Sequence, residues 1–247
     1  MSLARTRAAQ EEYLLLLEEQ DRRDRQSMFY KMFPEERLEW RGETFYPRSA
    51  YPKHMEFIEA TSRIREVCMM AANRSGKTHL GAFVTTVWAT GLYPTWWNGR
   101  RFPGPVRVWA AGKTNETTRD IIQTKLLGDV TFVDGRKMLT GTGMIPGKFL
   151  MEPTWRSGIA DTVDTIKVRH VSGDYSVLGL KSYQQGRGSF EGTAQHVIWM
   201  DEEPGLDVAT ECLTRTATVD GQMIYTFTPL EGVSEVARRF LPGEDLG

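Results

Sequence analysis

One eight-residue segment constrains the fold of this chain more than any other. Residues 71 to 78 read AANRSGKT and directly follow the apolar run Val67 to Met70. A strand, a loop of small residues and a helix opening with Gly76, Lys77 and Thr78 can wrap a phosphate group in backbone N–H donors. In this pattern the lysine reaches the phosphates and the threonine hydroxyl holds Mg²⁺. The segment therefore predicts a nucleotide phosphate site on an α/β sheet.

One position of this loop departs from the usual pattern, because Ala71 stands where the first glycine is expected. The turn must then be made by a residue with a Cβ atom, which weakens the match without breaking it. The residues expected to surround the phosphates are Ala71, Ala72, Asn73, Arg74, Ser75, Gly76, Lys77 and Thr78.

A second Gly-Lys-Thr sequence occurs at residues 112 to 114. The chain before Gly112 reads RVWAA, which is strand-like up to the glycine. No residues are left there to encircle a phosphate. We therefore interpret Gly112 as a strand-to-helix turn and the first copy as the phosphate loop.

Acidic residues that could partner the loop follow another apolar run. Asp201, Glu202 and Glu203 come directly after Val197 to Met200. A buried parallel strand has this composition, and ligands sit at the carboxyl ends of such strands. Asp201 is expected to hold Mg²⁺ and Glu202 to polarise an attacking water, as hydrolysis requires. For Glu203 the competing interpretation is a solvent-facing or structural carboxylate.

Three arginines are candidates for stabilising charge on a transferring phosphate, because a guanidinium is planar and permanently charged. Arg187 lies in the glycine-rich segment QQGRGSFEG between the two motifs, and Arg74 lies inside the loop. Arg215 lies in the helix expected after the acids and is the weaker third candidate. For Arg187, an ordinary surface turn is the alternative.

Apolar runs alternate with helical patterns along the chain. Strands are expected at 66–70, 106–111, 166–171, 177–183, 197–200 and 223–228, and helices at 3–26, 54–60, 77–89, 115–127 and 208–216. In the helix over 115–127, Ile121, Ile122 and Leu126 are expected to share one face. Residues 128 to 158 are glycine-rich and expected to be irregular. This alternation predicts a mostly parallel, twisted sheet covered on both faces.

Composition narrows the class of protein and of partner. No segment predicts a transmembrane helix or a signal peptide, and two cysteines set no disulfide framework, so a cytoplasmic compartment is expected. The formal net charge is −1, so DNA contacts would need local basic patches. Trp96, Trp97, Arg100 and Arg101 form one candidate cluster. The commoner role of such tryptophans is to fix a long loop to the core.

Several longer segments together resemble the ATPase domain of the large terminase subunit of tailed bacteriophages, the motor that packages DNA into procapsids. They are AANRSGKT, GLYPTWWNGRRF, WAAGKTNETTRDIIQTKLLG, YQQGRGSFEGTAQHVIWMDEEP and TFTPLEG, within residues 51 to 240. The resemblance implies a P-loop NTPase of the additional-strand, catalytic-glutamate type, with a mostly parallel twisted sheet and helices on both faces. It also implies double-stranded DNA as substrate, a homo-oligomeric ring on a portal, a small terminase subunit as partner, no membrane, and action in the cytoplasm of an infected bacterium.

The resemblance implies a role for each motif residue. Lys77 and Thr78 would bind ATP and Mg²⁺, while Asp201 would contact the metal and Glu202 would be the catalytic glutamate. An arginine would act on the nucleotide of a neighbouring subunit, with Arg187 the first choice. Arg74 is the alternative to Arg187 for this role. The coupling motif TFTPLEG would place Thr226 and Thr228 beside the γ-phosphate.

Two departures from the family pattern affect these expectations. Members commonly carry an upstream glutamine that reads adenine, but no glutamine occurs from Tyr46 to Ala72, so base recognition is expected near Tyr51 or His54. Full-length terminases also carry a nuclease domain, for which this chain leaves no room. The expected organisation is an N-terminal helix and connector over residues 1–50, acting as a lid or partner contact, and an ATPase core over residues 51–247.

Other functions remain open from the sequence alone. A helicase-like or repair ATPase could use the same loop and acids. A nucleotide-gated assembly module could bind ATP without productive turnover. A small-molecule kinase fits least well, because the Asp201 and Glu202 pair suits the activation of water.

Overall fold

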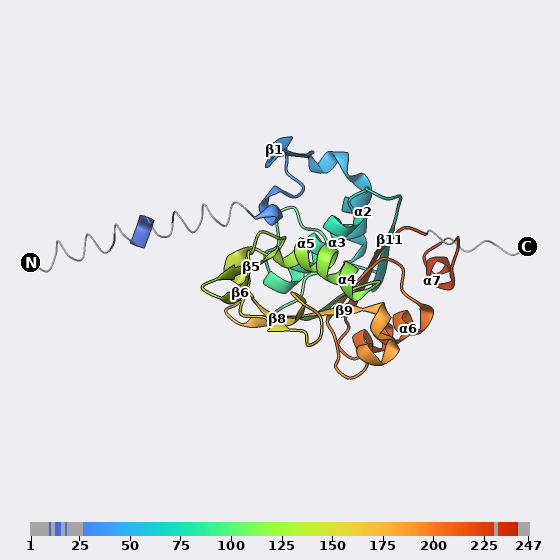
Figure 1. The fold of residues 1–247 in the computed structure, drawn as a ribbon. Helices are drawn as coiled ribbons and strands as arrows, with labels where there is room; N and C mark the ends of the chain where they lie inside the picture. Colours follow the sequence, from blue (N-terminus) through green and yellow to red (C-terminus); the bar gives the residue numbers. More distant parts are fainter. Residues whose placement is uncertain (1–9, 11–12, 16–17, 19–26, 230–231, 242–247) are drawn as a thin grey trace, which may run out of the picture.

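The structure is a computed structural model that describes residues 10, 13–15, 18, 27–229 and 232–241. Its main element is a seven-stranded sheet in the order β3-β11-β10-β4-β9-β8-β7 (Figure 1). The parallel strands are β3 (Glu66–Met70), β11 (Gln222–Phe227), β10 (Val197–Asp201), β4 (Arg107–Gly112) and β9 (Tyr175–Ser182). Two antiparallel strands, β8 (Val163–Arg169) and β7 (Thr154–Trp155), complete one edge.

The helix after the phosphate loop is the centre of one side of the molecule. α3 (Lys77–Thr90) starts after Gly76 and ends at Gly91, both with positive φ, 83° and 75°. Beyond Lys77 its sequence holds no residue with a permanent charge, and nearly all of it is buried. A helix that is apolar on all sides needs cover on all sides.

None of the helices in the described part of the chain is long and apolar enough to cross a membrane.

Alternate residues of each parallel strand enter two separate cores. Val197 and Trp199 pack on the side of α3, whereas Ile198 and Met200 pack on the side of α6 (Leu206–Ala217). Such strands are apolar on both faces, as a parallel sheet between helical layers requires. The mostly parallel sheet and the helices on both faces, predicted from the sequence, are confirmed.

The N-terminal segment packs on α3 from the outside. It contains η1 (Met28–Lys31), the hairpin β1 (Leu38–Trp40) and β2 (Glu43–Phe45), η2 (Arg48–Ala50) and α2 (Pro52–Ala60). Phe29 and Phe33 contact Phe83 of α3, with ring centroids 5.2 and 5.1 Å apart. Most of the helix expected over residues 3–26 lies outside the described residues.

The helix after β4 contains a π-helical segment that the sequence pattern did not predict. α4 (Asn115–Thr117), η3 (Thr118–Gln123) and α5 (Thr124–Leu127) follow one another without a break, and η3 is π-helical. Ile122 and Leu126 are buried, but Ile121 is 41% exposed, so its expected place on the shared face was wrong. A π turn adds a residue to the repeat and rotates the following side chains, which a 3.6-residue period cannot anticipate.

The region expected to be irregular contains a hairpin. β5 (Val130–Val133) and β6 (Arg136–Leu139) pair antiparallel around Asp134 and Gly135, whose φ angles are 48° and 74°. Asp-Gly with two positive φ angles is the favoured two-residue hairpin turn. The strands were missed because none of their side chains is buried, so no run of apolar residues marks them in the sequence. η4 (Gly147–Phe149) follows before β7.

The aromatic and basic cluster fixes a loop to the core. The indole N–H groups of Trp88 and Trp97 both donate to the Arg100 carbonyl, at 2.8 and 3.0 Å. Trp96 stacks on Phe83, and the Arg100 guanidinium pairs with Asp220 at 2.7 Å. This arrangement matches the structural interpretation of the tryptophans.

Gly81 is the residue of α3 that we expect to tolerate a side chain least. A methyl group there would collide with the Trp199 indole. Gly81→Ala should lower the free energy of unfolding by about 1–3 kcal/mol through overpacking, although the same change in an open helix is favourable by about 1 kcal/mol. Denaturant midpoints would measure the difference. Gly104→Ala is the control, since nothing lies within 4 Å of a Cβ atom there. Equal losses in both variants would contradict the packing argument.

Candidate nucleotide and metal site

The phosphate loop and the acidic residues meet at one edge of the sheet. β3 ends at Met70 just before the loop, and β10 ends at Asp201. β11 lies between these two strands and is parallel to both. The carboxyl ends of all three strands therefore converge. This inserted strand is the feature that defines the additional-strand class of P-loop NTPases, so the predicted fold class is confirmed.

The loop has the backbone geometry of an anion-binding nest. Arg74 and Gly76 have left-handed φ angles of 63° and 83°, which turn successive N–H groups toward one side. Ala71 is not among the residues with positive φ, so its backbone does not require the expected glycine. The Lys77 ammonium is buried and donates to the Ala72 carbonyl at 2.8 Å. The buried Ser75 hydroxyl has no partner within the described chain.

A buried carboxylate connects the loop to both neighbouring strands. The Thr78 hydroxyl donates to Asp201 at 3.1 Å, and the Thr226 hydroxyl donates to the same carboxylate at 2.7 Å. The Trp199 indole in turn donates to Thr226 at 2.7 Å. Burial raises the pKa of Asp201 to about 6, against the lowering effect of the two hydroxyl groups. The structure thus brings together three residues predicted from separate motifs.

The chemistry of this donor set fits Mg²⁺. A hydroxyl oxygen and a carboxylate oxygen from Thr78 and Asp201 face one another at the start of α3, and oxygen is the ligand that Mg²⁺ prefers. The partnerless Ser75 hydroxyl lies three residues before Thr78 and is a further polar group without a protein partner. A phosphate-bound cation at this position would complete these contacts.

Glu202 adopts an unusual backbone conformation. Its φ angle is 64°, and its N–H donates to the Thr226 carbonyl at 3.1 Å. Left-handed geometry in a residue other than glycine is strained and clusters at functional sites. Glu202 lines a cavity at the strand ends that Lys113 and Thr228 also line. Its neighbour Glu203 accepts a hydrogen bond from Ser234, which caps α7 (Glu235–Arg238).

Tyr183 is a site residue that motif matching did not single out. It begins η5 (Tyr183–Gln185), directly after β9, and its hydroxyl lies 3.2, 3.0 and 3.1 Å from the carbonyls of Ala111, Asp201 and Glu202. Burial raises the pKa of this phenol well above its usual value, so it remains a hydrogen-bond donor. The hydroxyl joins the ends of β4 and β10. Tyr183 is the first residue of the segment YQQGRGSFEGTAQHVIWMDEEP, but the sequence assigned it no role of its own.

The segment TFTPLEG contacts both halves of the site. Thr226 reaches the Asp201 carboxylate, and the Thr228 hydroxyl lies 2.9 Å from the Ala71 carbonyl and 3.0 Å from the Asn73 side-chain oxygen. One short segment therefore touches the acidic strand and the phosphate loop. Residues 230 and 231 of the motif lie outside the described residues.

The candidate arginines occupy two different environments. Arg187, in η6 (Arg187–Phe190), pairs with the buried carboxylate of Glu211 on α6 at 2.9 Å. Arg215 pairs with the same carboxylate at 2.8 Å. Arg187 is nevertheless 58% exposed. Arg74 lies in the loop itself, is exposed, and forms no ion pair within the described part of the chain.

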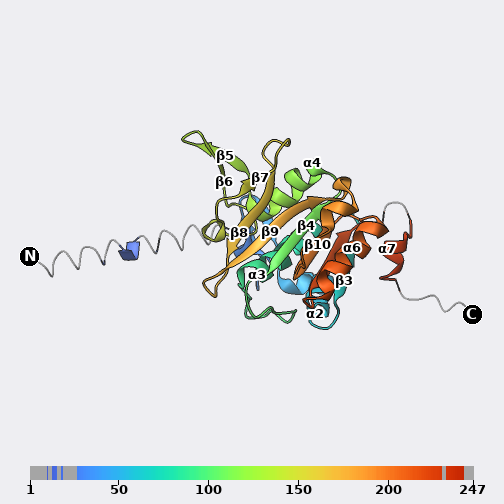
Figure 2. The same cartoon turned by 90° about the horizontal axis from the view of Figure 1, so that it is seen from below.

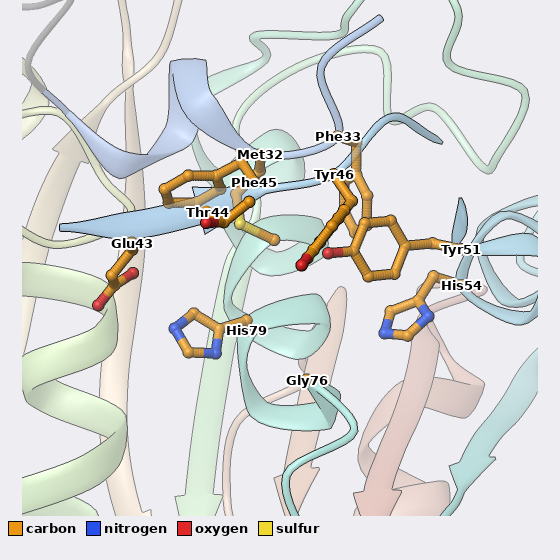
Figure 3. Close-up of a pocket in the computed structure, with 10 residues that line it drawn as sticks. All are labelled: Met32, Phe33, Glu43, Thr44, Phe45, Tyr46, Tyr51, His54, Gly76 and His79. Atoms are coloured by element: carbon orange, nitrogen blue, oxygen red, sulfur yellow. The ribbon is translucent and has the colours of Figure 1, made fainter. Parts of the chain in front are cut away.

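A pocket opens beside the start of α3, between that helix and the N-terminal segment (Figure 3). It is lined by Met32, Phe33, Glu43, Thr44, Phe45, Tyr46, Tyr51, His54, Gly76 and His79. None of these residues has an amide side chain. Burial lowers the pKa of His54, and burial with the nearby Lys125 lowers the pKa of His79 to about 4. Both imidazoles are therefore neutral near pH 7.

The chain is similar in sequence to proteins of known families. A family model described as terminase large subunit, T4-like virus type, N-terminal, matches residues 68–245. The large terminase subunit of Salmonella phage P22 is 35% identical over 215 residues, covering 79% of this chain but 42% of that protein. The chain thus spans less than half the length of this relative.

The solved structures that align with this chain are more distant. The large terminase ATPase domain of Thermus phage P74-26 aligns with a TM-score of 0.44 and 14% identity, over 77% of this chain and 70% of that one. A large terminase from a thermophilic bacteriophage, solved in complex with ADP, aligns with a TM-score of 0.44 and 15% identity, over 71% of this chain and 38% of that one.

Tyr183→Phe tests the hydroxyl that joins the strand ends. Removing the donor leaves buried carbonyls unpaired, so the free energy of unfolding should fall by about 1–3 kcal/mol. The loss should be the same from pH 6 to pH 9, because the phenol stays protonated over this range in both the folded and the unfolded protein. Denaturation curves at several pH values measure this. Tyr175→Phe is the control, since Tyr175 is 40% exposed, and a similar loss there would exclude a special role for Tyr183.

Proposed function

We propose, because this chain belongs to the terminase large subunit family, that it hydrolyses ATP with Mg²⁺ to drive double-stranded DNA into a viral procapsid. The observation that carries the proposal is the hydrogen-bonded set of Thr78, Asp201 and Thr226 beside the phosphate loop. A helix N-terminus, a buried carboxylate and a nest of N–H groups at one sheet edge together suit a metal-bound triphosphate.

The loop residues would exchange internal contacts for contacts with the nucleotide. Lys77 would leave the Ala72 carbonyl and reach the β- and γ-phosphates, since its ammonium already points into the loop. Thr78 and Asp201 would hold Mg²⁺, which when bound supplies neutralising charge on the phosphate oxygens. Ser75 and Gly76 would offer backbone N–H groups to the same phosphates.

Glu202 would orient and deprotonate the attacking water. Its carboxylate belongs to the cavity at the strand ends rather than to the sheet interior, so water has access to it. The strained backbone fixes the side chain directly after the metal-binding Asp201. A general base next to the metal-bound phosphate suits hydrolysis better than transfer to a metabolite.

The base of the nucleotide would occupy the pocket in Figure 3, which Gly76 and His79 of the phosphate-binding region also line. Aromatic rings such as Tyr46 and Tyr51 could stack on it. Recognition would then rely on stacking, backbone groups and neutral imidazoles, because no lining residue is a glutamine. This proposal is consistent with the absence of the family's usual upstream glutamine.

TFTPLEG would couple hydrolysis to movement. Thr226 contacts the metal-binding carboxylate and Thr228 contacts the loop, so a change at either group reaches β11.

Movement of DNA would further require subunits arranged as a ring on a portal, with the small terminase subunit as a partner. We place this activity in the cytoplasm of an infected bacterium, away from membranes. Residues 1–50 would serve as a lid or partner contact for the core over 51–247.

Glu202→Gln should retain ATP binding but lose on the order of 10²–10⁴-fold in turnover, because it removes only the general base. Single-turnover phosphate release and nucleotide binding, measured on the same preparation, separate the two effects. Glu203→Gln is the matched control and should keep turnover within a few-fold, since Glu203 is held by Ser234. Wild-type turnover in Glu202→Gln would remove this residue from the mechanism.

The arginines can be assigned by their dependence on assembly. Arg187→Ala should lower turnover on the order of 10³-fold only where subunits associate, if its guanidinium acts on a neighbour's phosphate. Arg74→Ala should act equally in monomer and assembly, because Arg74 lies in the chain's own loop. Phosphate release measured alongside sedimentation distinguishes them. A loss in monomeric Arg187→Ala would contradict the trans role.

A further inference from the structure

A strongly basic surface lies on a part of the sheet that no motif marked. β4, β9 and β8 present Arg107, Lys167, Arg169 and Lys181 on the side opposite α3. We refer to this surface as the basic sheet face. Arg107, Lys167 and Arg169 are exposed, and Lys181 is half-buried.

Strand register places these side chains on one face. Val177 of β9 lies opposite Arg107 on one side and Lys167 on the other, and Arg169 lies opposite Tyr175. Directly opposed residues of neighbouring strands point to the same side, and neighbouring strands are about 4.8 Å apart. Arg169 thus lies one row of side chains away from Arg107 and Lys167, and Lys181 lies two rows beyond them in the other direction on the same face.

Two further contacts fix the orientation of this face. The Lys181 ammonium lies over the Trp109 ring, 5.3 Å from its centroid, and Trp109 belongs to the core on the α6 side. The residues between the cations, Val168, Leu178 and Leu180, enter the opposite core beneath α3. One side of these strands is therefore apolar, whereas the other side carries the four cations together with Val177 and Trp109.

Among the described residues, no α-helix packs on the basic sheet face. α6 packs on β10 and β11, while α3 and η3 pack on the other side of β8 and β9. Figure 2 shows α6 over one part of the sheet and β8, β9 and β4 open beside it. This open, rigid surface is unlike a mobile loop, because its backbone is hydrogen-bonded within the sheet.

The cations of this face lack ion-pair partners in the described part of the chain. Among those residues none of the four forms an ion pair. Burial lowers the pKa of Lys181, and the charge of Asp164 opposes this shift. Of the two acids nearest in sequence, Asp164 pairs with Arg156 at 3.1 Å, while Asp174 accepts the Tyr175 N–H at 2.8 Å and pairs with none of the four cations. The formal net charge of the chain is only −1. Cations without ion pairs that are gathered on one surface create a local positive potential, which attracts an anionic partner.

We propose that the basic sheet face contacts the phosphate backbone of duplex DNA. The proposal rests on the proposed function, for which it supplies the DNA surface. Protein interfaces have apolar or aromatic centres, whereas this face is dominated by Arg and Lys, the residues that bind phosphates. Backbone contacts carry no sequence information, which suits a motor that must move along any sequence.

The test compares two double variants of equal charge change. Lys167→Gln with Arg169→Gln removes two cations from the face, while Lys53→Gln with Arg63→Gln removes the same residue types from the region of α2, beside β3 at the opposite edge of the sheet. Fluorescence anisotropy with a labelled 30-base-pair duplex measures affinity from 50 to 200 mM salt. The first variant should bind on the order of tenfold more weakly, with a salt slope shallower by about 0.9 per lost phosphate contact. The second should bind as wild type.

Further measurements keep the outcomes distinct. Lys167→Arg with Arg169→Lys should retain wild-type affinity, and thermal unfolding should show that all variants are folded. Unchanged DNA binding in the Gln variant would overturn the proposal, as would a loss of subunit association with DNA affinity intact, which would indicate an acidic protein partner. ATP hydrolysis without DNA is measured in parallel. If ATP hydrolysis is absent but the Gln variant still shows the salt-dependent loss of DNA affinity, the proposed ATPase function is wrong and the proposed DNA surface is supported.

Discussion

The site depends on one buried carboxylate. Asp201 is 3% exposed, and such a charge is tolerated inside a protein only when it is hydrogen-bonded. Its partners, Thr78 and Thr226, come from the first helix after the loop and from the strand between. The carboxylate therefore fixes the relative positions of β10, β11 and α3. The phosphate loop occupies its place because these three elements meet there.

The same carboxylate connects the site to the core. Trp199, one of the largest fully buried side chains, donates its indole N–H to Thr226 and leaves no space for a side chain at Gly81. Packing against α3 and hydrogen bonding at Asp201 are thus parts of one arrangement. The opposite core beneath α6 reaches the site through Tyr183, whose hydroxyl contacts the Asp201 and Glu202 carbonyls.

Much of this site was predictable because its residues are contiguous. The loop over 71–78 and the acids after Met200 each sit at a strand end, where local pattern predicts both the element and the residue types that follow it. Tyr183 was not predictable, since its role depends on three carbonyls from distant segments. Ile121 is exposed because the helix contains a π turn. A prediction based on the 3.6-residue period of a regular α-helix cannot detect such a turn.

The sequence by itself determined the fold class, the phosphate loop, the acidic pair and the membership of the family, because each depends on short runs whose spacing is set along the chain. Tertiary structure alone decided which cations share a surface. Arg107 and Lys167 lie on strands separated by β9, and they are neighbours only through its register. A register is fixed by burying one side of every strand at once, so no single segment contains it.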